Sequence, residues 1–183
     1  MDDNTQNTTQ DTTDSSGSSV EDLIQQTMHL AFWDKLESEM KTKKYEMLLG
    51  VLDEVRFRVC EMIPNRTDLH NSLYEHIDVD LLEQMLKHDA VDNTYIYNTI
   101  QFIIDQLKQL DCIEDEPYYE IWRTQVNKRL EDPECPLYIL LPIFLRETFF
   151  RIEKIDYSIK MFKESDLYKV IKERRNSIHG DID

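Results

Sequence analysis

The segment 135–145 constrains the fold most strongly, because it is apolar on nearly every side of any helix that it forms. Such a helix is typical of the most buried element of a fold. The segment is too short to span a bilayer, and it contains Pro136 and Pro142. Apolar residues then recur at helical spacing at Phe149, Ile152, Ile155, Ile159 and Phe162. We therefore expect one long helix that is opened by prolines, kinked at Pro142 and wrapped by the other helices.

Steps of three and four between apolar residues predict six further helices earlier in the chain. The first has a face running from Val20 to Met40, and the second and third cover about 45–63 and 68–77. The fourth has its apolar stripe at 81–86, the fifth has its stripe at 96–110, and the sixth starts at 114–117 and carries apolar residues as far as Leu130. Asp80 and Asp92 are the expected caps of the fourth and fifth helices, and Pro117 suits the first turn of the sixth. Only three glycines occur in the chain, which favours helices over a sheet rich in turns. The predicted fold class is all-α, with about seven helices in a single domain.

The first nineteen residues contain nothing apolar after Met1. They cannot bury enough surface to offset the entropy of ordering them. We expect a disordered, acidic, Ser/Thr-rich tail over 1–19, a helical domain over 20–175 and a flexible C-terminus over 176–183.

The net charge of −16 is concentrated in the body of the chain, where residues 20–145 carry −13. This charge repels phosphate backbones, so we do not expect a nucleic-acid partner. Cys60, Cys112 and Cys135 lack a C-x-x-C spacing, and we interpret them as reduced, mostly buried thiols. The polar start of the chain does not resemble a signal peptide. We expect a soluble protein of the cytoplasm without a transmembrane segment.

Histidines offer the one pattern that suggests an enzyme. His88 and Asp89 are adjacent, and His70 and His76 precede them. A metal-dependent, all-α phosphohydrolase of the histidine-aspartate type brings such residues together on one or two metal ions. His70 and His76 are six residues apart, however, so they do not share a helix face. We predict no catalytic, metal-binding or cofactor-binding residue, and a phosphohydrolase that uses His70, His88 and Asp89 is the alternative.

Two other groups of residues have a predicted role. Trp33 and Trp122 lie among apolar residues at helical spacing, so we expect both in the core. Near the C-terminus the sequence places a candidate partner-binding basic patch at Lys169, Lys172, Arg174 and Arg175. This patch suits an acidic partner, a membrane surface or the acidic tail, and it also suits the C-terminal end of a helix dipole.

Several short motifs, in this order, resemble those of the T-complex protein 11 family over roughly 20–163. They lie at 29–36 (HLAFWDKL), 48–49 (LL), 63–64 (IP), 80–84 (DLLEQ), 88–92 (HDAVD) and 152–159 (IEKIDYSI). Three positions depart from the family pattern. Asp89 stands where the family has a glycine, Glu114-Asp115 replaces an Arg-Asp pair, and Ser158 replaces an asparagine. An Arg-Pro step that follows in the family is also missing here.

The resemblance implies an all-α regulatory protein rather than an enzyme, because the family is associated with cyclic-AMP and protein-kinase A signalling. We predict a non-catalytic helical interaction protein with a protein partner, whose identity and oligomeric state the sequence leaves open. A self-associating helical scaffold is a second alternative, beside the phosphohydrolase.

Overall fold

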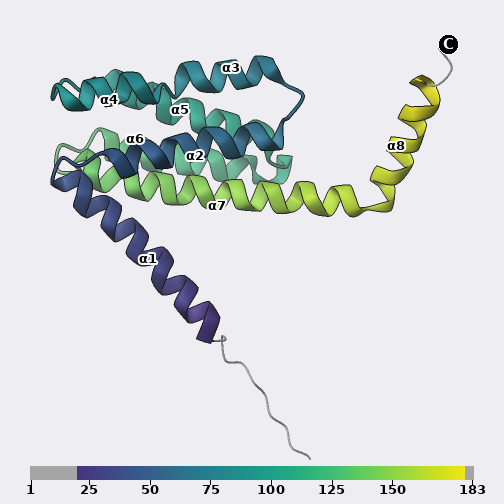
Figure 1. Cartoon of the computed structure of the whole chain (residues 1–183), viewed down its shortest axis with the longest axis horizontal. Helices are drawn as coiled ribbons and strands as arrows, with labels where there is room; N and C mark the ends of the chain where they lie inside the picture. Colours follow the sequence, from purple (N-terminus) through teal and green to yellow (C-terminus); the bar gives the residue numbers. More distant parts are fainter. Residues whose placement is uncertain (1–19, 180–183) are drawn as a thin grey trace, which may run out of the picture. The chain divides into compact units, whose positions relative to one another are not determined.

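The computed structural model describes the backbone of residues 20–179 and the side chains of residues 20–175. In this part of the chain the fold is all-α, and no residue is in a strand. The elements are α1 (Val20–Lys41), α2 (Glu46–Met62), α3 (Thr67–His76), α4 (Val79–Lys87), α5 (Asn93–Leu110), the 3-10 turn η1 (Ile113–Asp115), α6 (Glu116–Leu130), α7 (Leu137–Glu164) and α8 (Asp166–His179) (Figure 1). The expected tail at 1–19 lies outside the described residues, and α8 runs four residues into the segment that we expected to be flexible.

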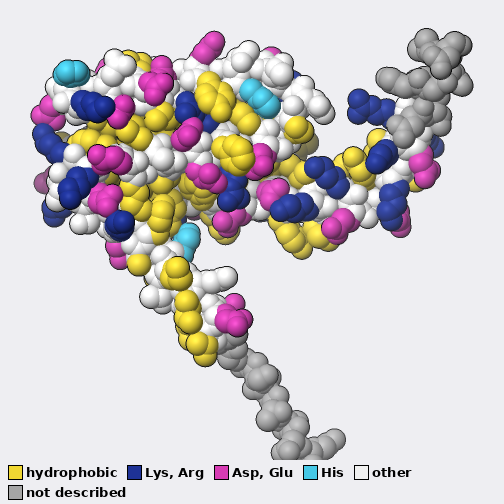
Figure 2. Space-filling model, in the orientation of Figure 1, with side chains coloured by type: hydrophobic (Ala, Val, Ile, Leu, Met, Phe, Trp, Pro, Cys, Tyr) yellow, Lys and Arg dark blue, Asp and Glu magenta, His cyan; other side chains and the backbone are white. Residues whose placement is uncertain are grey.

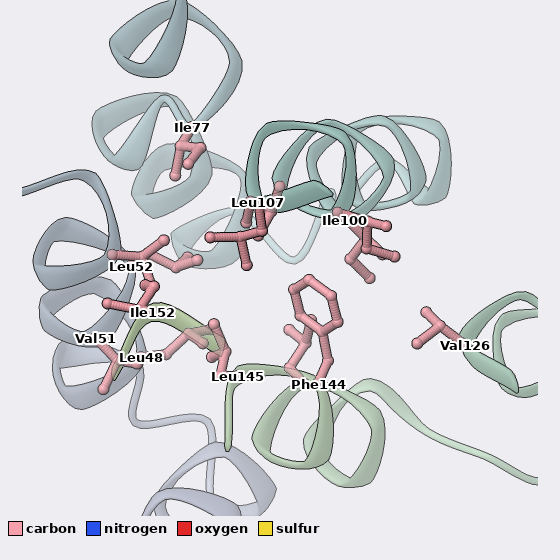
Figure 3. Packing of buried hydrophobic residues seen from close by; sticks show 14 of the residues in the cluster. Leu48, Val51, Leu52, Ile77, Ile100, Leu107, Val126, Phe144, Leu145 and Ile152 are labelled. Carbon is pink, nitrogen blue, oxygen red and sulfur yellow. The ribbon is translucent and has the colours of Figure 1, made fainter. Parts of the chain in front are cut away.

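Helix α7 is the central element of the body that begins at Trp33, as the apolar segment predicted. It packs against α2, α5, α6 and α8. Leu140, Phe144 and Leu145 are at most 1% exposed. Figure 3 shows Leu145 on the side of Leu48 of α2, and Phe144 on the side of Ile100 of α5 and Val126 of α6. The buried Pro142 lies inside α7, which runs on to Glu164.

Two short helices complete this body. Helix α3 packs on α2 and α5, and α4 packs on α2. Their buried residues, Leu73 and Leu82, join the same apolar cluster as the residues of α7. The core therefore has α7 on one side, α2, α5 and α6 next to it, and α3 and α4 beyond them (Figure 1).

The caps of three helices show how local sequence sets their starts. Asp92 caps α5 as predicted, since its carboxylate accepts a hydrogen bond from the Thr94 amide at 2.8 Å. The prediction for α4 was wrong: Asp78, not Asp80, is the cap, and it accepts from the Leu81 amide at 2.9 Å. Asp78 has the extended backbone that a cap requires, whereas Asp80 already lies in the first turn.

Ser165 separates α7 from α8, which we had not expected as a helix of its own. Its backbone is extended, with φ −69° and ψ 151°. Its hydroxyl accepts a hydrogen bond from the Tyr168 amide at 3.2 Å, the geometry of a helix N-cap. One serine thus ends the long helix and starts the next.

The apolar face expected along α1 is not continuous. Trp33, Leu36 and Met40 are buried, and the Trp33 ring lies 6.1 Å from that of Phe149. Within residues 20–32, taken by themselves, every side chain is exposed. The core roles predicted for Trp33 and Trp122 are confirmed, because they are 6% and 5% exposed.

Candidate functional site

The structure does not bring together the residues of the phosphohydrolase alternative. His70 Nε2 donates to the Ile63 carbonyl at 2.9 Å, so it closes the end of α2. His88 is the exposed C-cap of α4. The one group of potential metal ligands among the described residues contains neither histidine nor Asp89. The geometry of the described residues therefore does not support the alternative that assigned metal chemistry to His70, His88 and Asp89.

Asp89 instead ends a helix. Its φ is 55°, in the left-handed region, and its amide and that of Ala90 donate to carbonyls of the last turn of α4. Lys43, with φ 58°, occupies the same place after α1. Both ends have the hydrogen bonds of a Schellman motif. The two residues also form an ion pair, because Lys43 Nζ lies 2.8 Å from Asp89 Oδ1.

The largest polar cluster joins η1 and the start of α6 to the middle of α7. Its centre is Arg151, which is 5% exposed. The Arg151 guanidinium lies 3.4 Å above the Tyr118 ring, and its Nε donates to Glu147 at 3.1 Å. The Tyr118 hydroxyl donates to the same Glu147 carboxylate at 2.7 Å. Arg151 is therefore held from two helices.

Asp115 connects this cluster to η1. Its carboxylate pairs with Lys154 of α7 and lies 3.8 Å from the Arg151 guanidinium. The Cys112 thiol also donates to it, at 2.7 Å. Hydrogen bonds from Cys112 and Lys154 hold the pKa of Asp115 below its ordinary value. Asp115 is thus an ionised anchor between η1 and α7.

Asp111, Cys112 and Asp115 form the one potential metal-ligand group of the described residues, with ligand atoms within 4.8 Å of one another. Each is already engaged in the protein. The Tyr119 hydroxyl donates to Asp111 at 2.8 Å, and Lys154 occupies the open side of Asp115. The hydrogen bond to Asp115 raises the pKa of the Cys112 thiol. This group therefore fits a structural role better than a metal site.

The cysteines correct another expectation. Cys60 and Cys135 are half-buried and Cys112 is exposed, so the prediction of mostly buried thiols was wrong. All three are free. Cys112 is exposed because it lies in the turn between α5 and η1, where polar contacts replace apolar packing.

A groove of about 570 Å³ lies between the start of α5, the end of α6 and the start of α7. Tyr97, Glu131, Asp132 and Leu140 are among its lining residues. The lining contains carboxylates and apolar groups but no His, Lys or Arg. Nothing in it resembles a general acid paired with a base or a nucleophile.

Comparison with known proteins accounts for the order of these elements. A family model described as T-complex protein 11 matches residues 2–112, which is more than half of the chain. The chain belongs to the T-complex protein 11 family.

A relative named T-complex protein 11 homolog, from Homo sapiens, is 24% identical over 146 residues. The alignment covers 78% of this chain but 27% of the relative, so the chain spans about a quarter of that relative's length. No solved structure matches the chain.

The motifs that resemble the T-complex protein 11 family have structural roles in this member. Trp33, Leu48 and Leu82 are buried, Asp92 caps α5, and Ile152 and Ile155 are 1% exposed on α7. Asp89, where the family has a glycine, occupies a left-handed position that glycine adopts at little cost. These residues of the family motifs therefore stabilise the helical body.

The predicted basic patch lies on α8, where its four cations are exposed (Figure 2). Helix spacing divides them between two sides. Lys169 and Lys172, three residues apart, share one side, and Lys169 pairs with Asp166 at 2.9 Å. Arg174 lies on the other side, because it follows Leu167 by seven residues, Val170 by four and Ile171 by three. The structure places the four cations on one helix but not on one face.

Sequence reasoning missed the apolar side of α8. Leu167, Val170 and Ile171 are 62%, 46% and 47% exposed, and α7 does not cover them. Their spacing of three and four was available as a signal. It was overlooked because we counted only the charges of this segment.

No helix among residues 20–179 combines the length and the apolarity that crossing a bilayer requires.

Proposed function

We propose that this T-complex protein 11 family member is a non-catalytic interaction module of the cytoplasm that acts through contacts with a protein partner. Family membership carries the proposal, together with the apolar and basic surface that α8 leaves uncovered. Exposed apolar side chains that are bordered by polar ones are a feature of protein-binding surfaces.

The polar clusters support binding rather than chemistry. Every buried side-chain nitrogen or oxygen among the described residues has a hydrogen-bond partner. Arg151, Glu147 and Asp115 bind one another, and none of the three is directed at an open cavity that holds a second reactive group. An active site usually leaves such groups available to a substrate.

The pathway that we propose is cyclic-AMP and protein-kinase A signalling, as the family resemblance implies. Within the predicted patch of Lys169, Lys172, Arg174 and Arg175, we propose Arg174 and Arg175 as the partner-binding cations, because Lys169 is already paired with Asp166. At physiological salt, the interaction between exposed charges is largely screened beyond about 8 Å. The negative charge of the acidic body therefore does not cancel the attraction of these cations for a carboxylate that lies close to them.

Purified components test this proposal. Tagged full-length chain is titrated separately with the regulatory and the catalytic subunit of the cyclic-AMP-dependent kinase, and heat is measured by calorimetry. We expect one subunit to bind with a Kd of about 1–10 µM, as is typical of transient signalling contacts. Heat that is indistinguishable from dilution with both subunits, from chain whose helical circular dichroism is intact, would overturn the kinase assignment.

The same preparation tests catalysis directly. Turnover of a general phosphatase substrate in the presence of manganese, lost in a His88→Ala variant, would overturn the non-catalytic part of the proposal. We expect no difference between the variant and the original chain.

A further inference from the structure

Helix α8 presents one face that is both apolar and cationic. Leu167, Val170 and Ile171 fall at spacings of three and four, and Arg174 continues the same row. All four side chains are exposed. Arg175 follows at the edge of this face, next to Ile171 in the helical projection. We name these five residues the α8 face.

The cations of the α8 face are available to a partner. No ion pair joins Arg174 or Arg175 to a carboxylate among the described residues, whereas Lys169 on the other side is paired with Asp166. Tyr168 turns toward α7 instead, where its ring lies 5.5 Å from that of Phe162. Tyr168 lies seven residues before Arg175, so the contact with α7 borders the Arg175 edge of the face, while Leu167, Val170 and Arg174 lie 100° or more away from it in the helical projection.

We propose that the α8 face binds an acidic amphipathic helix of another protein. The apolar stripe of that helix covers Leu167, Val170 and Ile171, and its carboxylates pair with Arg174 and Arg175. Anchors at spacings of three, four and seven are how one helix recognises another. This inference rests on the proposed interaction function and names the chemistry of the partner.

The position of Arg174 favours a protein helix over a lipid surface. A helix that lies in a membrane interface keeps its cations on the polar side and its apolar residues in the lipid. In the helical projection, Arg174 lies between Val170 and Ile171. Lipid that covered the apolar residues would therefore also have to cover the charge of Arg174. A carboxylate on a partner helix neutralises the same charge with paired hydrogen bonds.

A symmetric pairing of two copies through α8 is disfavoured by the same residues. Two α8 faces in parallel contact would bring Arg174 and Arg175 of both copies together, and in antiparallel contact these arginines would face the apolar residues of the other copy; neither arrangement supplies a carboxylate on those faces. Like charges in an interface oppose association. The occupant is therefore a helix of opposite charge.

The test uses the full-length chain and two labelled synthetic helices of about 20 residues, or ~30 Å. Both carry leucine at spacings of three and four; one has glutamate beside the leucines, and the other has lysine in its place. Fluorescence anisotropy measures binding. We expect the glutamate helix to bind at least about tenfold more tightly than the lysine helix.

Matched variants locate the contact. Arg174→Glu/Arg175→Glu and Lys169→Glu/Lys172→Glu change the net charge equally, but on different sides of α8. We expect the arginine pair to weaken binding of the glutamate helix about tenfold or more, and the lysine pair to change it less than about threefold. Leu167→Ala/Ile171→Ala should also weaken it by about tenfold. Circular dichroism confirms that each variant remains helical.

Three outcomes would overturn the inference. Equal effects of the arginine and lysine pairs would mean unspecific attraction rather than a face. Stronger binding to vesicles of phosphatidylcholine with phosphatidylserine than to the glutamate helix would identify a lipid surface. A dimer in light scattering that is lost in Leu167→Ala/Ile171→Ala would identify a second copy. If instead kinase subunits bind all variants equally, the proposed function stands and the α8 face is not its site.

Discussion

Helices α7 and α8 follow each other in the chain, and both carry apolar residues at helical spacing, yet their surroundings differ completely. Ile155 of α7 is 1% exposed, while Ile171 of α8 is 47% exposed. Helices α2, α5 and α6 cover α7, whereas α7 alone packs against α8. Apolar spacing thus predicts that a helix forms, but it does not reveal what covers the helix.

This difference in burial should appear in the free energy of unfolding of variants. Side chains on α7 stabilise the fold because water and cavities are excluded around them. Side chains on the α8 face are still in contact with water. The free energy of burying them is therefore gained only when a partner binds. The following predictions test this contrast, from the largest expected effect to the smallest.

Phe144→Ala should destabilise the fold by about 3–5 kcal/mol, because it leaves a cavity in the core. The Phe144 ring is 1% exposed and stacks on Trp122 at 5.3 Å between centroids. Urea unfolding followed by circular dichroism measures the change. Phe150→Ala, in the same helix but 56% exposed, is the matched control and should cost less than about 1 kcal/mol. Equal losses of stability in the two variants would mean that the Phe144 side of α7 is covered no more than the Phe150 side.

Asp115→Asn should destabilise the fold by about 1–3 kcal/mol at neutral pH, because it leaves Arg151 and Lys154 without their shared carboxylate. Asp156→Asn, which removes a more exposed partner of Lys160, should cost less than about 0.5 kcal/mol.

The effect of Asp115 should also depend on pH. Its pKa is depressed in the folded protein, so its stabilisation is fully present above the unfolded value of about 3.9. The stabilisation is lost as the pH falls through the lower folded value. The stabilities of the original chain and of Asp115→Asn should therefore begin to converge as the pH falls below about 4. A difference that stays constant down to pH 3 would contradict the ion-pair role.

Asp89→Gly should stabilise the fold by about 0.5 kcal/mol, because glycine adopts the left-handed backbone of this position without strain. The ion pair with Lys43 is lost, but it is exposed and contributes little. Asp80→Gly, in the first turn of α4, should have the opposite sign and cost up to about 1 kcal/mol. A shift of the melting temperature in the same direction for both would refute this account of the α4 end.

Ile171→Ala should change stability by less than about 0.5 kcal/mol, since the side chain is exposed in the free protein. Ile155→Ala on α7 is the comparison and should cost about 2–5 kcal/mol. Thermal unfolding measures both. A large loss for Ile171→Ala would show that the protein itself already covers the α8 face.

Much of the fold followed from spacing alone. The all-α class, the start of α5 at Asp92, the buried tryptophans and the central place of α7 were predicted, because each rests on local periodicity or a local cap. The start of α4 was predicted at Asp80, but two nearby aspartates fit the pattern of a cap. Asp78 is the cap in the structure because it has the extended backbone that a cap requires. The break at Ser165 was missed because apolar spacing resumes in α8.

The polar cluster could not be predicted in the same way. Asp115 and Arg151 are far apart in the sequence, and nothing in their local spacing pairs them. They meet because α6 and α7 pack together, which brings the start of one helix beside the middle of the other. Long-range ion pairs depend on how helices pack, and periodicity carries no information on that arrangement. The split of the α8 cations between two sides, by contrast, was readable from helix spacing.

The late position of α7 in the chain has a consequence for biosynthesis. Leu48 of α2 and Phe144 of α7 belong to the same core cluster. A ribosome adds residues at roughly 5–20 per second, so the second emerges several seconds after the first. During that interval the apolar sides of α2 and α5 have no central helix to cover them. The nascent chain is therefore a candidate client for chaperones until α7 has left the ribosome. A messenger RNA that slowed translation just before codon 137 would prolong the exposure of these apolar sides. It would favour aggregation without altering a single residue of the protein.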